Sequence, residues 1–121
     1  MRTKTVTRTL FFSAAAAALV LLAGAADPAA ADDAKDLWAK NCAMCHGADG
    51  KGGTKAGKKL DCQDLTDPAV RAKFDKARMI AGTRDGVKND AGKEVMKGYG
   101  DKLSEDQIKA LIDYIHSAFG G

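Results

Sequence analysis

Aromatic residues are scarce in this sequence, and runs with the alternating pattern of a half-buried strand are scarcer still. Of the seven aromatic residues, five lie beyond residue 31: Trp38, Phe74, Tyr99, Tyr114 and Phe119. The shortage of strand patterns argues against sheet-based folds, because half-buried strands alternate apolar and polar residues. The chain has 121 residues, enough for one domain. We therefore expect one small all-α domain, a bundle of three to five helices with long loops.

An excess of basic charge is also missing. The formal net charge is +3, but Arg2, Lys4 and Arg8 all lie ahead of an apolar run at the N-terminus. Beyond residue 31 the chain has 16 Lys and Arg against 15 Asp and Glu. Nucleic-acid binding needs a strongly basic face. The composition therefore excludes nucleic acid as a partner.

The N-terminus has the parts of a secretory signal peptide. The basic start is followed by an apolar stretch over residues 10–26, by the helix breaker Pro28, and by the small-residue site Ala29-Ala30-Ala31. We predict cleavage before Asp32, with cleavage before Asp27 as second choice. The sequence then divides into a signal peptide, residues 1–31, and a mature domain, residues 32–121.

A retained membrane anchor is the alternative for the same apolar stretch. Its length is near the minimum for a membrane span, and its alanine content makes it weakly hydrophobic. No other segment is apolar enough to cross a membrane, so we expect no span in the mature chain. Export would place that chain in an oxidising compartment, the periplasm or the outside.

Helix signals occur at four places. Asp32 or Asp33 can cap a first helix that leads into Asn41. Further helices are predicted from Asp67-Pro68, from Asp75 to about Gly86, and over 105–119 behind a capping box of Ser104 and Gln107. Glycines predict a loop over 47–60. Residues 87–102 show no clear period apart from a turn at 89–92.

The most informative motif is Cys42-Ala43-Met44-Cys45-His46. Two thiols three residues apart can each add to a vinyl group on one edge of haem, and the next residue is then held under the iron as an axial ligand. This pattern is a signal for c-type haem attachment. A small domain with long loops would also gain from a large apolar cofactor at its centre.

Other uses of these cysteines remain open at this point. A thiol-redox CxxC of thioredoxin type expects a βαβ setting, and strand signals are poor. A zinc site could combine Cys42, Cys45, Cys62 and His116, although there is no second close pair. A Cys42–Cys45 disulfide would close only a very small ring. Cys62 could be a partly buried small residue or could pair between molecules.

Over residues 33–119 the sequence resembles a class I cytochrome c. The resemblance rests on the helix leading into CAMCH and on Met96-Lys97-Gly98-Tyr99-Gly100 ahead of the last helix. It implies a cytochrome c-like bundle wrapped around one haem, with Cys42 and Cys45 as covalent attachments, His46 as one axial ligand and Met96 as the other. A thioether is a soft neutral ligand suited to haem iron. Met79 and His116 are the alternatives to Met96.

Two features depart from the family pattern. Lys97 follows the ligand methionine, where proline is common, and residues 47–66 contain no proline. Members of the family often have a proline in the loop that follows the attachment motif, and the carbonyl of that proline orients the axial histidine. Another backbone carbonyl near 60–65 would have to accept the histidine proton here.

The function implied by the resemblance is periplasmic electron transfer, with one electron carried on a covalent haem c and no reaction catalysed. Partners would be other exported or membrane-bound redox proteins, and the chain would be a monomer. The alternatives are an electron-entry subunit of a larger redox enzyme, a haem sensor with an open iron site, and a haem-free thiol redox module.

Overall fold

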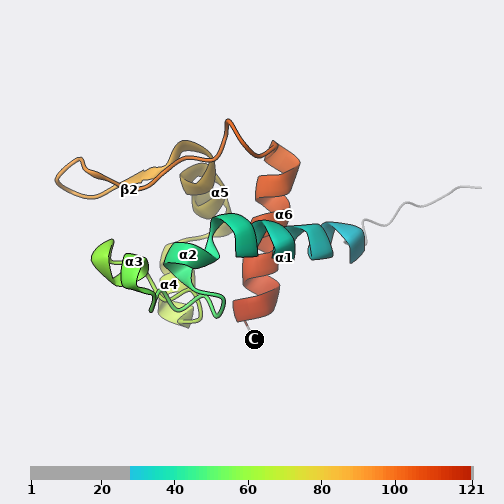
Figure 1. Cartoon of the computed structure of the whole chain (residues 1–121), viewed down its shortest axis with the longest axis horizontal. Coiled ribbons are helices and arrows are strands. Elements are labelled where there is room, and N and C mark those ends of the chain that lie inside the picture. Colours follow the sequence, from blue (N-terminus) through green and yellow to red (C-terminus); the bar gives the residue numbers. More distant parts are fainter. Residues whose placement is uncertain (1–27, 121) are drawn as a thin grey trace, which may run out of the picture.

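The computed structural model describes residues 28–120, a mostly helical domain with one small hairpin (Figure 1). The elements are α1 (Pro28–Asn41), α2 (Ala43–His46), α3 (Lys55–Lys59), α4 (Pro68–Lys73), α5 (Lys76–Asp85), β1 (Val87–Lys88), β2 (Glu94–Met96) and α6 (Glu105–Phe119). The all-α prediction is confirmed. The described part holds one helix more than the largest number expected, because it includes the very short helices α2 and α3.

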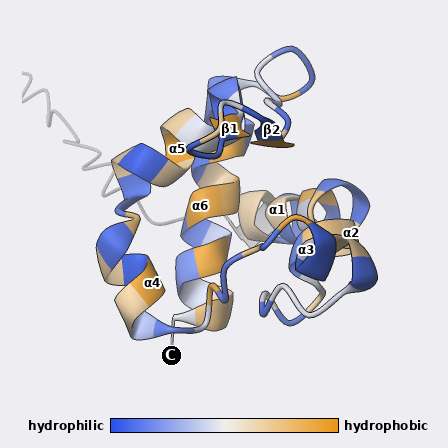
Figure 2. Cartoon of the chain, turned by 90° about the vertical axis from the view of Figure 1, so that its left-hand side faces the viewer, coloured by the Kyte–Doolittle hydropathy of each residue, from blue (hydrophilic) through white to orange (hydrophobic). Residues whose placement is uncertain are grey.

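Helices α1 and α6 cross and form the core (Figure 1). Helix α6 begins at the predicted capping box: Ser104 Oγ accepts from the Gln107 N–H, and the Gln107 side chain accepts from the Ser104 N–H. Its apolar residues recur at helical spacing, visible as alternating orange and blue along the ribbon in Figure 2. The buried side chains at the crossing are Trp38, Ile108, Leu111, Ile112 and Ile115.

Helices α4 and α5 begin where the sequence predicts. Asp67 Oδ1 accepts from Ala69 N, and Asp75 Oδ1 accepts from Arg78 N, each at 2.8 Å. The Arg71 guanidinium then donates to the carbonyls of Leu65, Thr66 and Phe119, at 2.8–3.1 Å. This side chain ties the segment before α4 to the end of α6.

Three sequence-based predictions about elements were wrong. Helix α1 already includes Pro28, the first described residue, and so extends ahead of Asp32 and Asp33, which we expected as its caps. Residues 55–59, assigned to a loop, form α3 behind Thr54 as N-cap. The predicted signal peptide is not among these corrections, because its residues 1–27 lie outside the described residues.

The third correction concerns residues 87–96, which form an antiparallel hairpin. Val87 pairs with Met96 and Lys88 with Glu94. The predicted turn is present: Asn89 Oδ1 accepts from Ala91 N and Lys93 N, and Gly92 has φ of 76°. Strands of two and three residues are too short to show a period of two, which explains why the sequence pattern missed them.

The chain returns from the hairpin against α5. Tyr99 N donates to Thr83 O and Gly100 N donates to Arg84 O. The Tyr99 hydroxyl donates to the carbonyl of Asn41, the last residue of α1, at 3.0 Å. These bonds hold the segment after Met96 between α5 and the end of α1.

Candidate functional site

The motif Cys42–His46 continues the line of helix α1. Cys42 N donates to Trp38 O, and His46 N donates to Cys42 O, both at 2.9 Å. Cys42 has φ of −113° and ψ of −38°, so the backbone turns only slightly between α1 and α2. Residues four apart on a helical path share one face. Trp38, Cys42 and His46 therefore lie on the same side of the chain.

The glycine-rich segment after His46 folds back onto the motif. Gly47 has φ of 81°, a left-handed conformation that favours glycine, and Gly52 N donates to His46 O at 2.8 Å. Thr54 Oγ1 lies 2.8 Å from the Cys45 carbonyl oxygen and accepts from Gly57 N. A Cβ at Gly57 would overlap the carbonyl oxygens of Cys45 and Gly52. Helix α3 thus packs closely on α2.

Sequence reasoning missed Thr54 as a supporting residue. Its signal was present, because threonine is a common N-cap, but the five glycines of residues 47–60 pointed to a loop. Helix α3 forms there because Gly57 permits the close backbone approach to Cys45.

A cavity of about 960 Å³ opens between the motif, helix α5, the hairpin and α6. It is at the upper end of the usual volume of small-molecule sites. Its walls include all four residues predicted to bind the cofactor, together with Cys62 and the apolar side chains of Leu65, Leu111, Ile112 and Ile115. The fold thus brings Cys42, Cys45, His46 and Met96 to one shared cavity.

Three methionines border this cavity: Met44, Met79 and Met96. Met44 lies inside the motif and its residue is 77% exposed. Met79 lies on α5, half-buried against the core. Met96 is half-buried at the end of β2, not in the irregular loop that we expected, and faces the cavity from the hairpin. His116, the other alternative ligand, is not among the described residues that line the cavity.

The ionisation of the site suits neutral ligands. Burial, followed by the nearby Cys45, raises the pKa of the Cys42 thiol to about 11. Burial also raises the pKa of Cys62, and it lowers the pKa of His46, which keeps the imidazole neutral. Reactive CxxC thiols have depressed pKa values instead, so the haem-free thiol redox module is disfavoured.

The zinc and disulfide alternatives find no support in the described part of the chain. All three cysteines are free thiols there. No group of three or more His, Cys, Asp or Glu side chains is arranged to hold a metal ion within residues 28–120. Two thiols, a neutral imidazole and thioethers around a large, mainly apolar cavity do fit a haem attached through Cys42 and Cys45.

The backbone carbonyl that we expected to accept the His46 proton is not in place. His46 Nδ1 is buried and has no hydrogen-bond partner among the described residues, so no carbonyl from 60–65 accepts from it. The His46 ring itself borders the cavity.

Comparison with known proteins gives a consistent family. The cytochrome c family model matches residues 31–119. The cbb3-type cytochrome c oxidase subunit FixP of Azorhizobium caulinodans is 39% identical over 95 residues, covering 78% of this chain and 29% of that subunit. Subunit CcoP of Azospirillum brasilense is 32% identical, covering 78% and 30%. The chain thus spans just under a third of the length of these relatives.

Solved structures agree on the fold. The KustC0563 c-type cytochrome superposes with a TM-score of 0.59 at 27% identity, covering 69% of this chain and 94% of that one. Cytochrome cL of Methylophaga aminisulfidivorans has a TM-score of 0.57 at 16% identity, covering 78% and 58%, and supports the fold alone. Taken with the motif and its cavity, these matches show that the chain belongs to the cytochrome c family as a class I c-type cytochrome, an electron-transfer protein that holds haem covalently.

Proposed function

We propose that this chain is a periplasmic one-electron carrier with a single haem c, attached through Cys42 and Cys45 and ligated by His46 and Met96. The observation that carries the proposal is the shared cavity of about 960 Å³, which these four residues border from the α1–α2 side and from the hairpin. The thiols lie together on one wall, as attachment to one haem edge requires.

Each residue has a distinct task in this proposal. Cys42 and Cys45 each add S–H across one vinyl group, which forms a thioether without a leaving group. His46, neutral because burial lowers its pKa, would hold the iron through Nε2 and keep its proton on Nδ1. Met96, which borders the same cavity from the hairpin, would supply a soft, neutral sulfur. When bound, haem supplies a one-electron iron couple.

Ligation from both sides favours a carrier over a catalyst. With His46 and Met96 both as ligands, the haem would have no iron position left for a substrate, so electron exchange would be the remaining activity. Methionine ligation also raises the reduction potential. A second candidate, an electron-entry subunit, is favoured by the relatives named as cbb3 oxidase subunits.

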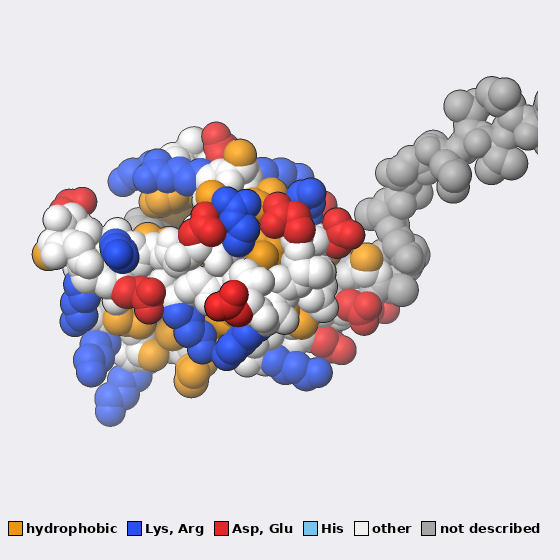
Figure 3. All heavy atoms as spheres, turned by 90° about the horizontal axis from the view of Figure 1, so that it is seen from above, with side chains coloured by type: hydrophobic (Ala, Val, Ile, Leu, Met, Phe, Trp, Pro, Cys, Tyr) orange, Lys and Arg blue, Asp and Glu red, His pale blue; other side chains and the backbone are white. Residues whose placement is uncertain are grey.

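The proposed setting follows from the N-terminal sequence. Residues 1–31 would direct export and be removed, leaving a monomeric domain over 32–121 whose partners are exported or membrane-bound redox proteins. Within residues 28–120, no helix is both long and apolar enough to cross a bilayer. Basic and acidic side chains are interleaved on the face seen in Figure 3, and mixed charge of this kind gives no reason to invoke nucleic acid.

Absorption spectra of methionine variants test the ligand set. The protein is expressed with haem-attachment machinery as wild type and as Met96→Leu, with Met79→Leu and Met44→Leu as matched controls that also border the cavity. Wild type and both controls should show low-spin ferric iron with the weak methionine–iron band. Met96→Leu should lose that band, and its reduction potential should fall.

Three results would contradict the proposal. Loss of the band in Met79→Leu with its retention in Met96→Leu would move the ligand to α5. High-spin ferric iron in the wild type would favour the sensor. A purified protein that elutes only with a larger partner, and not as a monomer, would favour the electron-entry subunit.

A further inference from the structure

The indole of Trp38 lies against the imidazole of His46. The ring centroids are 5.6 Å apart and the planes are tilted by 37°. Trp38 precedes Cys42 by four residues and His46 by eight, along a nearly continuous helical path joined by backbone hydrogen bonds. The spacing of the sequence therefore places both residues on one face of this path, and the structure brings their rings into contact across it.

On its other sides, Trp38 is held by aromatic residues of α6. Its ring centroid is 5.2 Å from that of Phe119 and 6.2 Å from that of Tyr114, with tilts of 53° and 52°. Tyr114 and Phe119 also contact each other edge-to-face at 5.9 Å. Trp38 is only 3% exposed. Its indole cannot rotate unless α1 and α6 separate, so it gives His46 a rigid wall.

Among residues 28–120, no hydrogen bond orients the His46 ring. His46 Nδ1 and Trp38 Nε1 are both buried, and neither has a hydrogen-bond partner among residues 28–120. With Nε2 bound to iron, the remaining imidazole proton is on Nδ1, and indole Nε1–H is only ever a donor. Two donors cannot satisfy each other. Ring packing is thus the contact through which Trp38 acts on His46.

We propose that Trp38 is a positioning residue for His46, whose indole sets the plane of the imidazole at the iron. In many metal sites a carbonyl or carboxylate on the second ring nitrogen fixes that plane. Here the aromatic group of Trp38, Tyr114 and Phe119 takes this role. The inference rests on the proposed function, because it takes His46 as the axial ligand.

Paramagnetic NMR of the ferric holoprotein tests the proposal. The hyperfine shifts of the four haem methyl groups depend on the orientation of the axial ring planes. Trp38→Leu removes the aromatic wall, and its methyl shifts should differ in spread or order from wild type. Trp38→Phe keeps a ring and should restore the wild-type pattern. Ile108→Ala, a fully buried core change outside the cavity, should lower stability without altering the pattern.

The positioning role of Trp38 and the proposed function can be refuted by different results. A folded Trp38→Leu with wild-type methyl shifts, or the same change in Ile108→Ala, would overturn the positioning role. If Trp38→Leu does not fold, nuclear Overhauser contacts between the Trp38 and His46 rings in wild type decide: their presence supports the role and their absence overturns it. A wild type without covalent haem would instead refute the proposed function.

Discussion

Two regions of the molecule differ in how they are stabilised. At the crossing of α1 and α6, Trp38 and four aliphatic residues of α6 are buried against one another. In residues 47–100, which form much of the cavity wall, only Leu65 and Tyr99 are buried hydrophobic residues. The first region has a core of its own. The second lacks one, and a bound haem would supply the missing apolar surface.

The largest expected effect comes from removing the haem. In a Cys42→Ser/Cys45→Ser variant, residues 47–100 should lose most of their amide protection, while α1 and α6 keep more of theirs, because only the latter pair bury their own apolar surface. Hydrogen–deuterium exchange measures both regions in one experiment. Cys62→Ser is the control and should keep its haem and its protection. Equal loss in both regions would remove the distinction.

Two isoleucines, one from each region, should contribute differently to the free energy of unfolding. Ile108 is fully buried on α6, whereas Ile80 on α5 is half-buried at the edge of the core. Ile108→Ala should lower the free energy of unfolding by about 2–5 kcal/mol. Ile80→Ala should lower it by less, since part of that side chain already contacts water. Denaturant unfolding of the holoproteins gives both values, and a larger effect at Ile80 would contradict the assignment of the core.

Ser104 and Thr54 each cap a helix, and substituting them should distinguish an effect on stability alone from an effect on the haem site. Ser104→Ala removes the cap of α6 and should cost about 1 kcal/mol without altering the ferric spectrum. Thr54→Ala removes the cap of α3 and the hydrogen bond to the Cys45 carbonyl, so the haem spectrum should change as well. Identical spectra for both variants would show that α3 does not support the motif.

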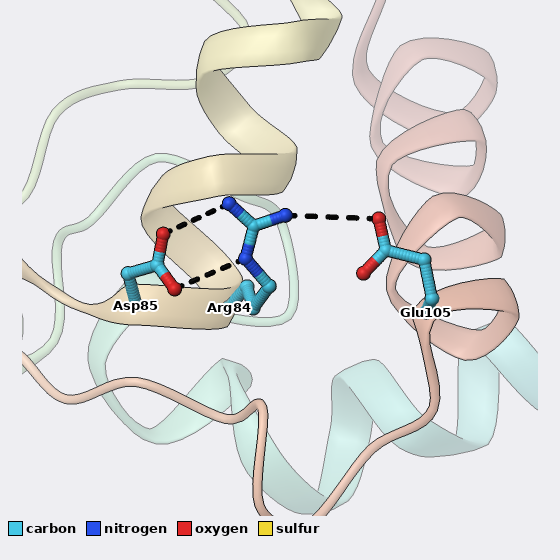
Figure 4. Close-up of polar contacts among 3 residues, drawn as sticks. All are labelled: Arg84, Asp85 and Glu105. Atoms are coloured by element: carbon cyan, nitrogen blue, oxygen red, sulfur yellow. Dashed lines mark hydrogen bonds and ion pairs between the residues drawn. The ribbon is translucent and has the colours of Figure 1, made fainter.

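The smallest expected effect is at the surface ion pairs of Arg84, shown in Figure 4. Arg84 donates twice to Asp85, at 3.0 and 2.9 Å, and lies 3.8 Å from Glu105 at the start of α6. The hydrogen bond from Arg84 holds the pKa of Asp85 below its usual value. That contribution is present at neutral pH and is lost as pH falls through the depressed pKa.

Arg84→Gln should therefore lower the melting temperature slightly at neutral pH and low salt. The difference from wild type should shrink in high salt, because both partners are exposed. It should vanish in acid, once Asp85 is protonated. A difference that persists in acid would mean that Arg84 acts through packing.

The helices with local sequence signals and the cavity walls also differ in how well they could be predicted from sequence. Helix α6 was predicted with its capping box, because Ser104, Gln107 and the apolar stripe all carry local signals. The starts of α4 and α5 followed from Asp67-Pro68 and Asp75 for the same reason. Each of these elements is specified by residues within a few positions of one another.

The cavity walls were predicted less well, since their structure depends on distant contacts. Helix α3 forms because Gly57 lies against the Cys45 and Gly52 carbonyls, and the hairpin is too short to show strand periodicity. The motif predicted which residues would line a shared site, but not the wall that Trp38 gives to His46. The spacing places Trp38 and His46 on one face of the chain, but it does not predict that their rings touch, because eight residues span about 12 Å along a straight helix.

The most direct test of the central claim is the intact mass of the purified protein under denaturing conditions, read together with its pyridine–alkali spectrum. With haem bound covalently, the chain should be heavier by one haem and should give a c-type haemochrome at one haem per chain. The Cys62→Ser variant should carry the same amount of haem. A protein without added mass, or with haem that dissociates on denaturation, would contradict covalent attachment at Cys42 and Cys45.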